Sequence, residues 1–333
     1  MRYFRLKRDD GKEWITDKLT DLLEDLGLVK FERSLRNSYK SEDRWVKVKD
    51  KGCLYRLERF EAKRKPKLSQ IKKKLNLVKT AVLLGDIHFC YEDKDAVDIL
   101  YQIIRDNKDV INEIIDGGDG INNDALSKFT STEDERFTLY DEIKAFDNHM
   151  SNLKEILPNA KFSIVEDNHY HLRKKRFLAD NPAMKGMMKD IDFKFDNVSP
   201  HGVPYFPFDQ TRVGVIHGLR VNDNFTKGHS ALFKEDIINF HTHGSQHYTC
   251  KNGSKMLNKQ AQKMWGMPSM CKQMDYMNGS PSRSNTGFGV LNCYPENEMY
   301  ELQYVFVENG MALYNGKLYT SELLDEKKNY TRS

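Results

Sequence analysis

The chain has 333 residues, 39% of them hydrophobic, which is enough for one large domain and a smaller one, each with a buried core. Its 53 Lys and Arg residues and 49 Asp and Glu residues give a formal net charge of +4. No apolar run approaches the roughly 20 residues of a membrane span, and charges interrupt residues 1–10 before a signal-peptide core could form. These features argue against a membrane protein and against export, and we expect a cytoplasmic protein.

The five cysteines follow no recognisable pattern. They contain no Cys-x-x-Cys pair and their number is odd, so neither a disulfide framework nor a zinc ribbon is indicated. The cysteines are Cys53, Cys90, Cys250, Cys271 and Cys293.

The charge is distributed unevenly along the chain. Residues 1–80 carry 24 Lys and Arg against 13 Asp and Glu, a net +11, whereas the rest carry 29 against 36, a net −7. A basic module of this kind suggests a polyanionic partner, most commonly nucleic acid. A Lys-rich surface that is merely solvated is the alternative. We expect a basic module at 1–62, a basic linker at 63–76, a main domain at 77–324 and a polar tail at 325–333.

The basic module is predicted to contain helices followed by a hairpin. Thr16 is placed to cap a helix that ends near Leu26, and a second short helix is expected over 31–38. Residues 44–49 and 53–60 are expected to pair as two strands. This order resembles a winged helix, which places one helix in a nucleic-acid groove.

From residue 77 the pattern changes to alternating strands and helices, which is typical of α/β proteins. Apolar residues at helical spacing predict helices over 93–105 and 134–157. Five apolar runs predict strands, and each ends in a cluster of Asp, Asn or His. The side chains at the carboxyl ends of such strands commonly form the functional site. The five strands are expected over 78–84, 110–115, 161–165, 212–216 and 236–240.

The first cluster is Leu83-Leu84-Gly85-Asp86-Ile87-His88. Side chains two residues apart in an extended chain point to the same side, so Asp86 and His88 can bind one metal ion. A strand-end Asp is often only a turn residue, but four similar clusters follow in order. They are Asp116-Gly117-Gly118-Asp119-Gly120, Glu166-Asp167-Asn168-His169, His217-Gly218 and His241-Thr242-His243-Gly244.

In this order the clusters resemble the motifs of the calcineurin-like metallophosphoesterase superfamily, over about residues 77–318. The resemblance implies a four-layer α/β/β/α sandwich with two divalent metal ions. Asp119 would bridge both ions, and His169 would be the catalytic histidine beside them. The first ion would be held by Asp86, His88, Asp119 and His243, and the second by Asp119, Asn168, His217 and His241.

Four residues depart from the superfamily's pattern, and none of them is one of these ligands. Asn122 stands where an acid often lies, Asp167 and Phe240 replace glycines, and Tyr170 replaces an acid. The long Gly-Asp-x-x-Asp-Arg-Gly signature of protein Ser/Thr phosphatases is absent. The run that begins at Asn168 looks more like phage-encoded members.

The last part of the chain is expected to contain a flap and further strands. Residues 250–277 are rich in Met, Lys and Gln with poor periodicity, which favours a mobile flap over the site. Residues 287–294, 299–308 and 311–314 alternate like strands, with Asn-Gly turns between them. These strands would complete the second sheet of the sandwich.

The residue types also indicate the chemistry. Two cations about 3.5 to 4 Å apart need an anionic bridge, which Asp119 supplies. Mixed nitrogen and oxygen ligands favour Mn²⁺, Fe²⁺ or Zn²⁺ over Mg²⁺ or Ca²⁺ and do not choose among the three. Of these we expect Mn²⁺, with Fe²⁺ or Zn²⁺ as alternatives. A water shared by the two ions is expected to lose its proton and attack phosphorus in line, with His169 assisting the leaving group. Arg173 and Arg283 are candidates for binding the substrate's phosphate.

Three functions are consistent with these features. The first, which we favour, is a nucleic-acid phosphodiesterase or nuclease in which the metal site cuts and the basic module holds the strand. The second is a phosphomonoesterase that acts on nucleotides, nucleic-acid ends or phosphoproteins. The third is a nucleic-acid-binding protein with a relict metal site.

Overall fold

The computed structural model divides into two compact units, residues 1–76 and 77–333. The residues that it describes are 2–8, 13–16, 23–24, 26, 28, 46–48, 53–61, 78–127, 137–210, 212–220, 224–250, 261–272, 285–294 and 299–324. Among the helices within these ranges, none combines the length and the apolar character that crossing a bilayer requires.

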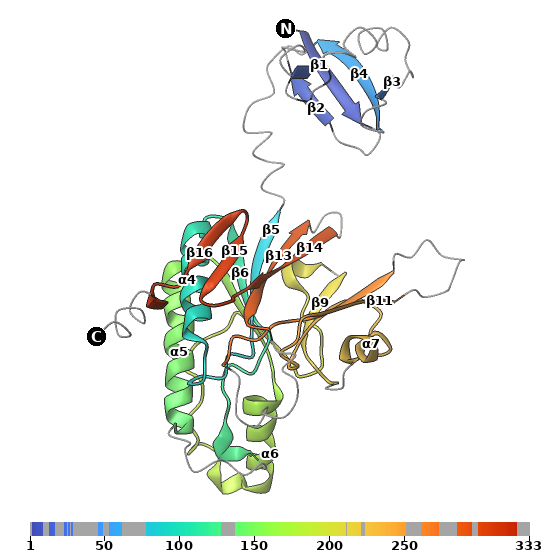
Figure 1. Ribbon diagram of the computed structural model, residues 1–333. Helices are drawn as coiled ribbons and strands as arrows, with labels where there is room; N and C mark the ends of the chain where they lie inside the picture. The colour runs from blue at the N-terminus through green and yellow to red at the C-terminus, as the bar shows by residue number, and fades with distance from the viewer. Residues whose placement is uncertain are drawn as a thin grey trace. The chain divides into compact units, whose positions relative to one another are not determined.

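The first unit contains a four-stranded antiparallel sheet in the order β2-β1-β4-β3 (Figure 1). Its strands are β1 (Arg2–Arg8), β2 (Glu13–Thr16), β3 (Val46–Val48) and β4 (Cys53–Glu61). The buried side chains of Leu6, Leu23 and Leu28 give this unit an apolar interior of its own.

Two of these strands, β1 and β2, were not predicted. Thr16 was expected to cap a helix, but it lies in β2 opposite Phe4. The predicted hairpin is confirmed as β3 paired with β4, whereas the helix expected over 31–38 lies outside the described residues. The winged-helix arrangement is therefore replaced by a sheet whose central strands are β1 and β4.

The second unit is an α/β fold built on a six-stranded, mainly parallel sheet in the order β14-β13-β5-β6-β7-β8. Strands β5 to β8 run parallel, and β13 and β14 extend the sheet in antiparallel fashion beside β5. Both faces of this sheet are covered at its centre, which explains why the central strand β5 reads as a nearly continuous apolar run. The bounds are β5 (Lys79–Leu84), β6 (Ile111–Asp116), β7 (Lys161–Val165), β8 (Asn197–Ser199), β13 (Gly287–Tyr294) and β14 (Met299–Phe306).

Two helices, α4 (Lys94–Asn107) and α5 (Leu139–Ile156), cover one face of this sheet (Figure 1). The side chain of Asp93 caps α4, and Thr138 and Asp141 form a reciprocal capping box at the start of α5. The apolar stripes of both helices pack into the larger core cluster of the unit. Both predicted helices are confirmed, although α5 begins at Leu139 rather than at 134, and 128–136 lie outside the described residues.

A second sheet, in the order β11-β12-β10-β9, packs against the other face through a separate core cluster. Successive side chains of β5 point to opposite faces of the first sheet. Leu83 therefore packs into the cluster between the sheets, and Leu84 packs into the cluster under the helices. On the outer side, α7 (Phe225–Ser230) places the ring of Phe225 against Gly266. The strands are β9 (Val213–His217), β10 (Asp236–Phe240), β11 (Gln246–Cys250) and β12 (Gln262–Gly266).

The structure corrects two predictions about the end of the chain. The strands expected over 287–294 and 299–308 do not complete the second sheet, because they join the first as β13 and β14. The flap predicted over 250–277 is wrong for β12, because this strand is paired between β10 and β11. The remaining parts at 251–260 and 273–277 lie outside the described residues.

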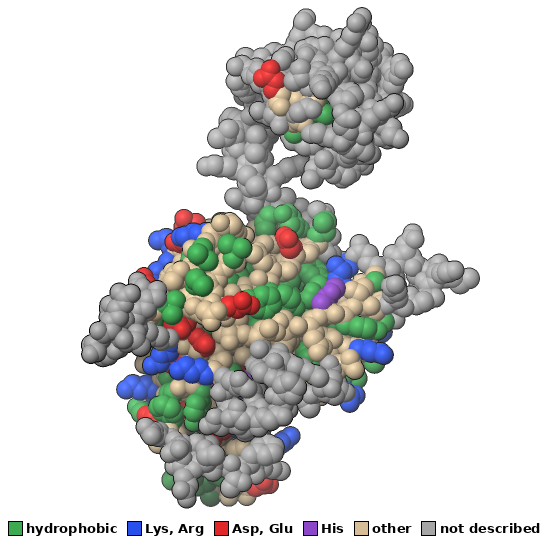
Figure 2. Space-filling view, viewed as in Figure 1, with side chains coloured by type: hydrophobic (Ala, Val, Ile, Leu, Met, Phe, Trp, Pro, Cys, Tyr) green, Lys and Arg blue, Asp and Glu red, His purple; other side chains and the backbone are tan. Residues whose placement is uncertain are grey.

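A hairpin of β15 (Met311–Tyr314) and β16 (Lys317–Thr320) follows these strands. Ala312 and Tyr319 face the larger core cluster. Leu313 is exposed, and hydrophobic side chains are visible over this part of the face in Figure 2. The hairpin therefore extends the helix-covered layer rather than the sheet on the opposite side.

Phe240, at the end of β10, links the two sheets at their strand ends. A methyl group added to Gly117 would lie 2.0 Å from Cδ2 of the Phe240 ring, and one added to Gly85 would lie 2.6 Å from Cδ1 of the same ring. The two glycines, which follow β6 and β5, therefore make room for the ring. The aromatic residue at this position is accommodated because both neighbouring strand ends lack side chains.

We expect Phe240→Ala to lower the free energy of unfolding of the metal-free protein by about 3 to 5 kcal/mol, since the cavity left between the sheets cannot close fully. Urea denaturation followed by circular dichroism measures this loss. Phe306→Ala is the matched control, because that ring lies on β14 and is partly exposed. A loss for Phe240→Ala no larger than that for Phe306→Ala would contradict the proposed role of the ring.

Candidate metal centre

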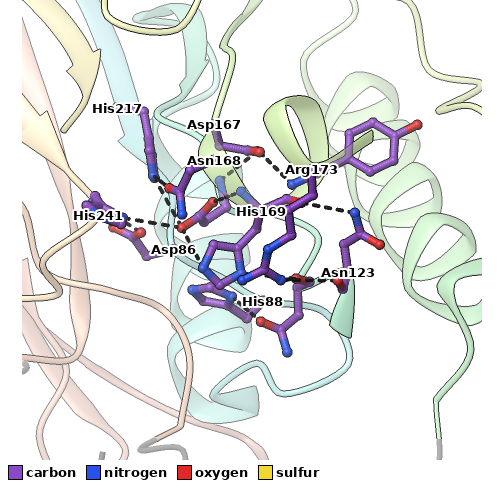
Figure 3. Close-up of polar contacts among 12 residues, drawn as sticks. Asp86, His88, Asn123, Asp167, Asn168, His169, Arg173, His217 and His241 are labelled. Atoms are coloured by element: carbon purple, nitrogen blue, oxygen red, sulfur yellow. Dashed lines mark hydrogen bonds and ion pairs between the residues drawn. The ribbon is translucent and has the colours of Figure 1, made fainter. Parts of the chain in front are cut away.

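The seven predicted ligands are positioned by the carboxyl ends of strands in both sheets. The first sheet supplies those that follow β5, β6 and β7, and the second sheet supplies those at the ends of β9 and β10. Figure 3 shows the labelled side chains from these separate segments lying close together. In chain order the residues are Asp86, His88, Asp119, Asn168, His217, His241 and His243.

Five of these residues adopt the left-handed backbone conformation that side chains usually avoid. Their φ angles range from 49° to 92°, and each such residue costs of the order of 1 kcal/mol. Hydrogen bonds between loops hold part of this arrangement, since the N–H of His88 donates to the carbonyl of Asp119 at 3.0 Å. Strain of this kind clusters at functional sites. The five are Asp86, His88, Asp119, His241 and His243.

The carboxylate of Asp119 lies at the centre of the arrangement and is only 1% exposed. Its Oδ2 lies 3.3 Å from Nε2 of His217 and 3.7 Å from Nδ1 of His241. Nε2 of His169 is also 3.7 Å from the same oxygen. The backbone N–H of Asp119 donates to Asp167 at 2.9 Å, which fixes the loop. Three imidazoles therefore surround one carboxylate oxygen.

A second group gathers around the carboxylate of Asp86, which is fully buried. Nε2 of His243 lies 3.6 Å from Oδ1 of Asp86 and 3.3 Å from Nε2 of His88. The N–H of His241 donates to both Asp86 oxygens, at 2.9 and 3.2 Å. These bonds connect the loop after β5, in one sheet, to the loop after β10, in the other.

On the second side of Asp119, Asn168 completes the set. Its Oδ1 lies 2.7 Å from Nε2 of His217, so the amide oxygen and the imidazole point at the same space. Asn168 begins a short π-helical turn, Asn168–Leu172, which is capped by the side chain of Asp167. The cap fixes the direction in which the chain leaves β7 and so places Asn168 and His169 beside Asp119.

The donor atoms fit divalent metal ions. Nδ1 of His241 is buried and has no hydrogen-bond partner among the described residues, although it points at Asp119. Such an orphaned atom is costly, and an ion bound about 2.0 to 2.2 Å from each donor would satisfy it. Within the described part of the chain, His, Cys, Asp and Glu side chains that lie close enough to share an ion form three groups: Asp86, His88 and Asp119; Asp119, His217 and His241; and His88, His243 and Cys271.

Burial and charge set the protonation of these groups. Burial alone would raise the pKa of Asp119, but the charges of His169 and His217 hold it well below its usual value. Burial opposes protonation of His217, yet Asp119 raises the pKa of His217 to about 10. In the same way Asp86 outweighs burial and raises the pKa of His243 well above its usual value. Without an ion, these two histidines supply the positive charge that the carboxylates need.

His88 behaves differently. Burial and the charge of His169 lower the pKa of His88 to about 3, so its ring is neutral at pH 7. The side-chain oxygen of Asn122 accepts a hydrogen bond from Nδ1 of His88 at 3.0 Å. The single ring proton therefore resides on Nδ1, and the lone pair of Nε2 faces His243.

The predicted catalytic and substrate residues lie beside this centre. Nδ1 of His169 lies 3.0 Å from the carbonyl oxygen of Asn122. Nη1 of Arg173 donates to the same oxygen at 2.9 Å and to the carbonyl of Asn123 at 3.1 Å. Arg283, the other substrate candidate, lies outside the described residues. The roles assigned to these residues stay predictions.

Three residues contribute contacts that the sequence did not indicate. Asp167 orders the loop after β7, and Asn122 holds His88 by its side chain and His169 by its carbonyl. Cys271 lies beside His243. In the sequence, Asp167 and Asn122 stood out only as departures from the superfamily's pattern. Nothing in the sequence around Cys271 singles it out.

No family model matches the chain, and no curated protein matches it significantly. What the fold and the clusters support directly is an α/β protein whose buried His, Asp and Cys groups could hold metal ions.

Metal binding is expected to release protons. His217 and His243 have raised pKa values and are protonated near pH 7, and an ion that binds their nitrogens must displace these protons. We therefore expect release of about two protons per chain at pH 7. Because protons compete with the ion for the same nitrogen atoms, the apparent affinity for Mn²⁺ should rise as the pH increases toward the pKa of His217, which is about 10.

Isothermal titration calorimetry with Mn²⁺, in two buffers of different ionisation enthalpy, counts the protons. His217→Ala should reduce the count by about one, and His247→Ala, an exposed histidine that stacks on Trp265, should leave it unchanged. A binding enthalpy that is the same in both buffers would show that no protons are displaced.

Proposed function

We propose that this protein is a metal-dependent phosphoesterase of the calcineurin-like metallophosphoesterase superfamily that hydrolyses phosphodiester bonds of nucleic acid. The observation that carries the proposal is that two groups of potential ligands share one buried carboxylate, that of Asp119. Two cations held in this way can bind the same phosphoryl group. The two packed sheets, with helices on their outer faces, are consistent with the superfamily's four-layer sandwich.

Each ion would be held by residues from both sheets. The mixed nitrogen and oxygen donors favour Mn²⁺, Fe²⁺ or Zn²⁺. When bound, a pair of such ions supplies neutralisation of phosphoryl charge and acidification of water. One ion would be held by Asp86, His88, Asp119 and His243, and the other by Asp119, Asn168, His217 and His241.

His169 is suited to move a proton to the leaving oxygen. Its side chain is 13% exposed, compared with 1% for Asp119, so a substrate can reach the ring. The carbonyl of Asn122 fixes Nδ1, which leaves Nε2 on the side of the metal ligands. A proton held at Nε2 can pass to the leaving oxygen as the bond to phosphorus breaks.

Arg173 is suited to bind oxygen atoms of the substrate's phosphate. Its Nη1 is anchored by the carbonyls of Asn122 and Asn123, and within the described ranges Nε and Nη2 have no hydrogen-bond partner. A guanidinium whose position is fixed but whose remaining donors are free binds phosphate oxygens as a planar fork. Figure 3 shows its side chain alongside His169, which shares the Asn122 carbonyl.

The charge distribution supports nucleic acid as the substrate. The first 80 residues carry a net +11, and the remainder carries a net −7. On the face shown in Figure 2, the Lys and Arg side chains of the second unit are scattered rather than gathered. The affinity for a polyanionic backbone would thus come from the front of the chain, through release of counterions.

The test is a substrate panel of single-stranded DNA, duplex DNA, RNA, an aryl phosphodiester and an aryl phosphomonoester, with Mn²⁺, Fe²⁺ or Zn²⁺ in turn. We expect hydrolysis of nucleic acid with Mn²⁺, and a fall of about 10³-fold or more in Asp119→Ala or His217→Ala, because several kcal/mol of transition-state stabilisation are lost. His247→Ala, an exposed histidine outside the centre, should retain full activity.

The other outcomes identify the alternatives. Turnover of the monoester far above that of the diester would indicate a phosphomonoesterase. Tight binding of ions without hydrolysis of any substrate would indicate a relict site in a nucleic-acid-binding protein.

The basic front of the chain is tested by comparing the full chain with residues 77–333. We expect the shorter chain to cleave the aryl diester at the same rate but nucleic acid with at least about tenfold lower kcat/KM at low salt, because its phosphate contacts are lost. The difference should shrink as salt screens those contacts. Equal kcat/KM on nucleic acid at low salt would remove the proposed role of residues 1–76.

A further inference from the structure

Three histidines of the centre share one arrangement. In each of them the Nε2 atom faces other potential ligands, and Nδ1 lies next to a hydrogen-bond acceptor on the opposite side of the ring. The three are His88, His217 and His243. Histidines that bind metals commonly donate their second N–H in this way, which fixes the ring and its tautomer. For His88 the acceptor is the amide oxygen of Asn122 at 3.0 Å, and for His217 it is the carbonyl of Gly117 at 2.9 Å.

For His243 the acceptor is sulfur. Sγ of Cys271 lies 3.7 Å from Nδ1 of His243, and both residues are buried. A thiol sulfur is a weak acceptor, and the contact completes the arrangement that oxygen atoms complete for the other two rings.

Cys271 is held in place by the loop after β5 rather than by the loop that carries His243. The N–H of Met270 donates to the carbonyl of Asp86 at 3.2 Å, and the N–H of Lys272 donates to the carbonyl of Tyr91 at 2.9 Å. Cys271 itself forms an isolated bridge with Glu92. The sulfur is therefore fixed relative to Asp86, which supplies the carboxylate on the opposite side of the His243 ring.

We propose that Cys271 is a positioning residue of the metal centre, whose sulfur accepts the Nδ1–H of His243 and keeps Nε2 directed at the ion. A neutral imidazole has one N–H, so a proton held on Nδ1 leaves the Nε2 lone pair free. The proposal rests on the metal-binding part of the proposed function and not on the substrate or the reaction.

The same geometry disfavours Cys271 as a ligand. His243 approaches Asp86 and His88 through Nε2, at 3.6 and 3.3 Å, whereas Cys271 lies against Nδ1 on the other side of the ring. For Cys271 to join the ion that Nε2 of His243 would share with Asp86, the ring would have to turn over and abandon Asp86. The sulfur thus acts through the histidine.

The test compares Mn²⁺ binding by the full-length wild-type chain with that of Cys271→Ala and Cys271→Ser. We expect Cys271→Ala to weaken binding about 10- to 100-fold, the usual effect of losing a partner of this kind. Cys271→Ser should recover part of the loss, because a hydroxyl also accepts a hydrogen bond. Cys293→Ala is the matched control, since that thiol is buried in the core between the sheets, and its affinity should equal that of the wild type.

Two further measurements make the test decisive. Thermal melting of the metal-free variants by circular dichroism should show no loss for Cys271→Ala beyond that for Cys293→Ala. The wild-type chain loaded with Co²⁺ should show ligand-field bands without a thiolate-to-cobalt charge-transfer band. A charge-transfer band that disappears in Cys271→Ala would make Cys271 a ligand and overturn the proposal.

Wild-type affinity in Cys271→Ala, or an equal loss in Cys293→Ala, would also overturn it. If the wild type bound neither Mn²⁺ nor Co²⁺, the metal centre and the role of Cys271 would fail together. If the wild type bound ions but hydrolysed no phosphate ester, only the proposed phosphoesterase activity would be contradicted.

Discussion

The stability of the second unit depends on neutralising one negative charge that is buried away from water. The carboxylate of Asp119 is almost fully buried, and an uncompensated charge in such a place would cost several kcal/mol. Compensation comes from His169 and His217, whose imidazoles approach one of its oxygens from segments far apart in the chain. Five loops must therefore converge, and several of them adopt strained backbone conformations to do so.

Much of this arrangement was predictable because it follows from rules that act locally. Both faces of β5 are covered, so this strand appears in the sequence as an apolar run. Parallel strands present their carboxyl ends at one edge, so the polar residues that follow each run were expected to meet. The structure brings Asp86, Asp119 and His217 together in agreement with that expectation.

The remainder could not be read from the sequence because it depends on which segments become neighbours. Nothing within Gly287–Tyr294 indicates that it pairs with β5 rather than with the second sheet. Strand β1 contains four Arg and Lys residues among its seven, so its apolar pattern is weaker than that of a strand buried on both faces. The contact of Cys271 with His243 joins two loops of irregular structure, for which no periodic signal exists.

The centre also spans the junction of the two sheets, since Asp86 and Asp119 belong to one and His217 and His243 to the other. A cation held by ligands from both would join them as a reversible cross-link beside the ring of Phe240. Separation of the sheets would then require the cation to dissociate, and the mechanical integrity of this unit would increase with the concentration of free metal in its surroundings.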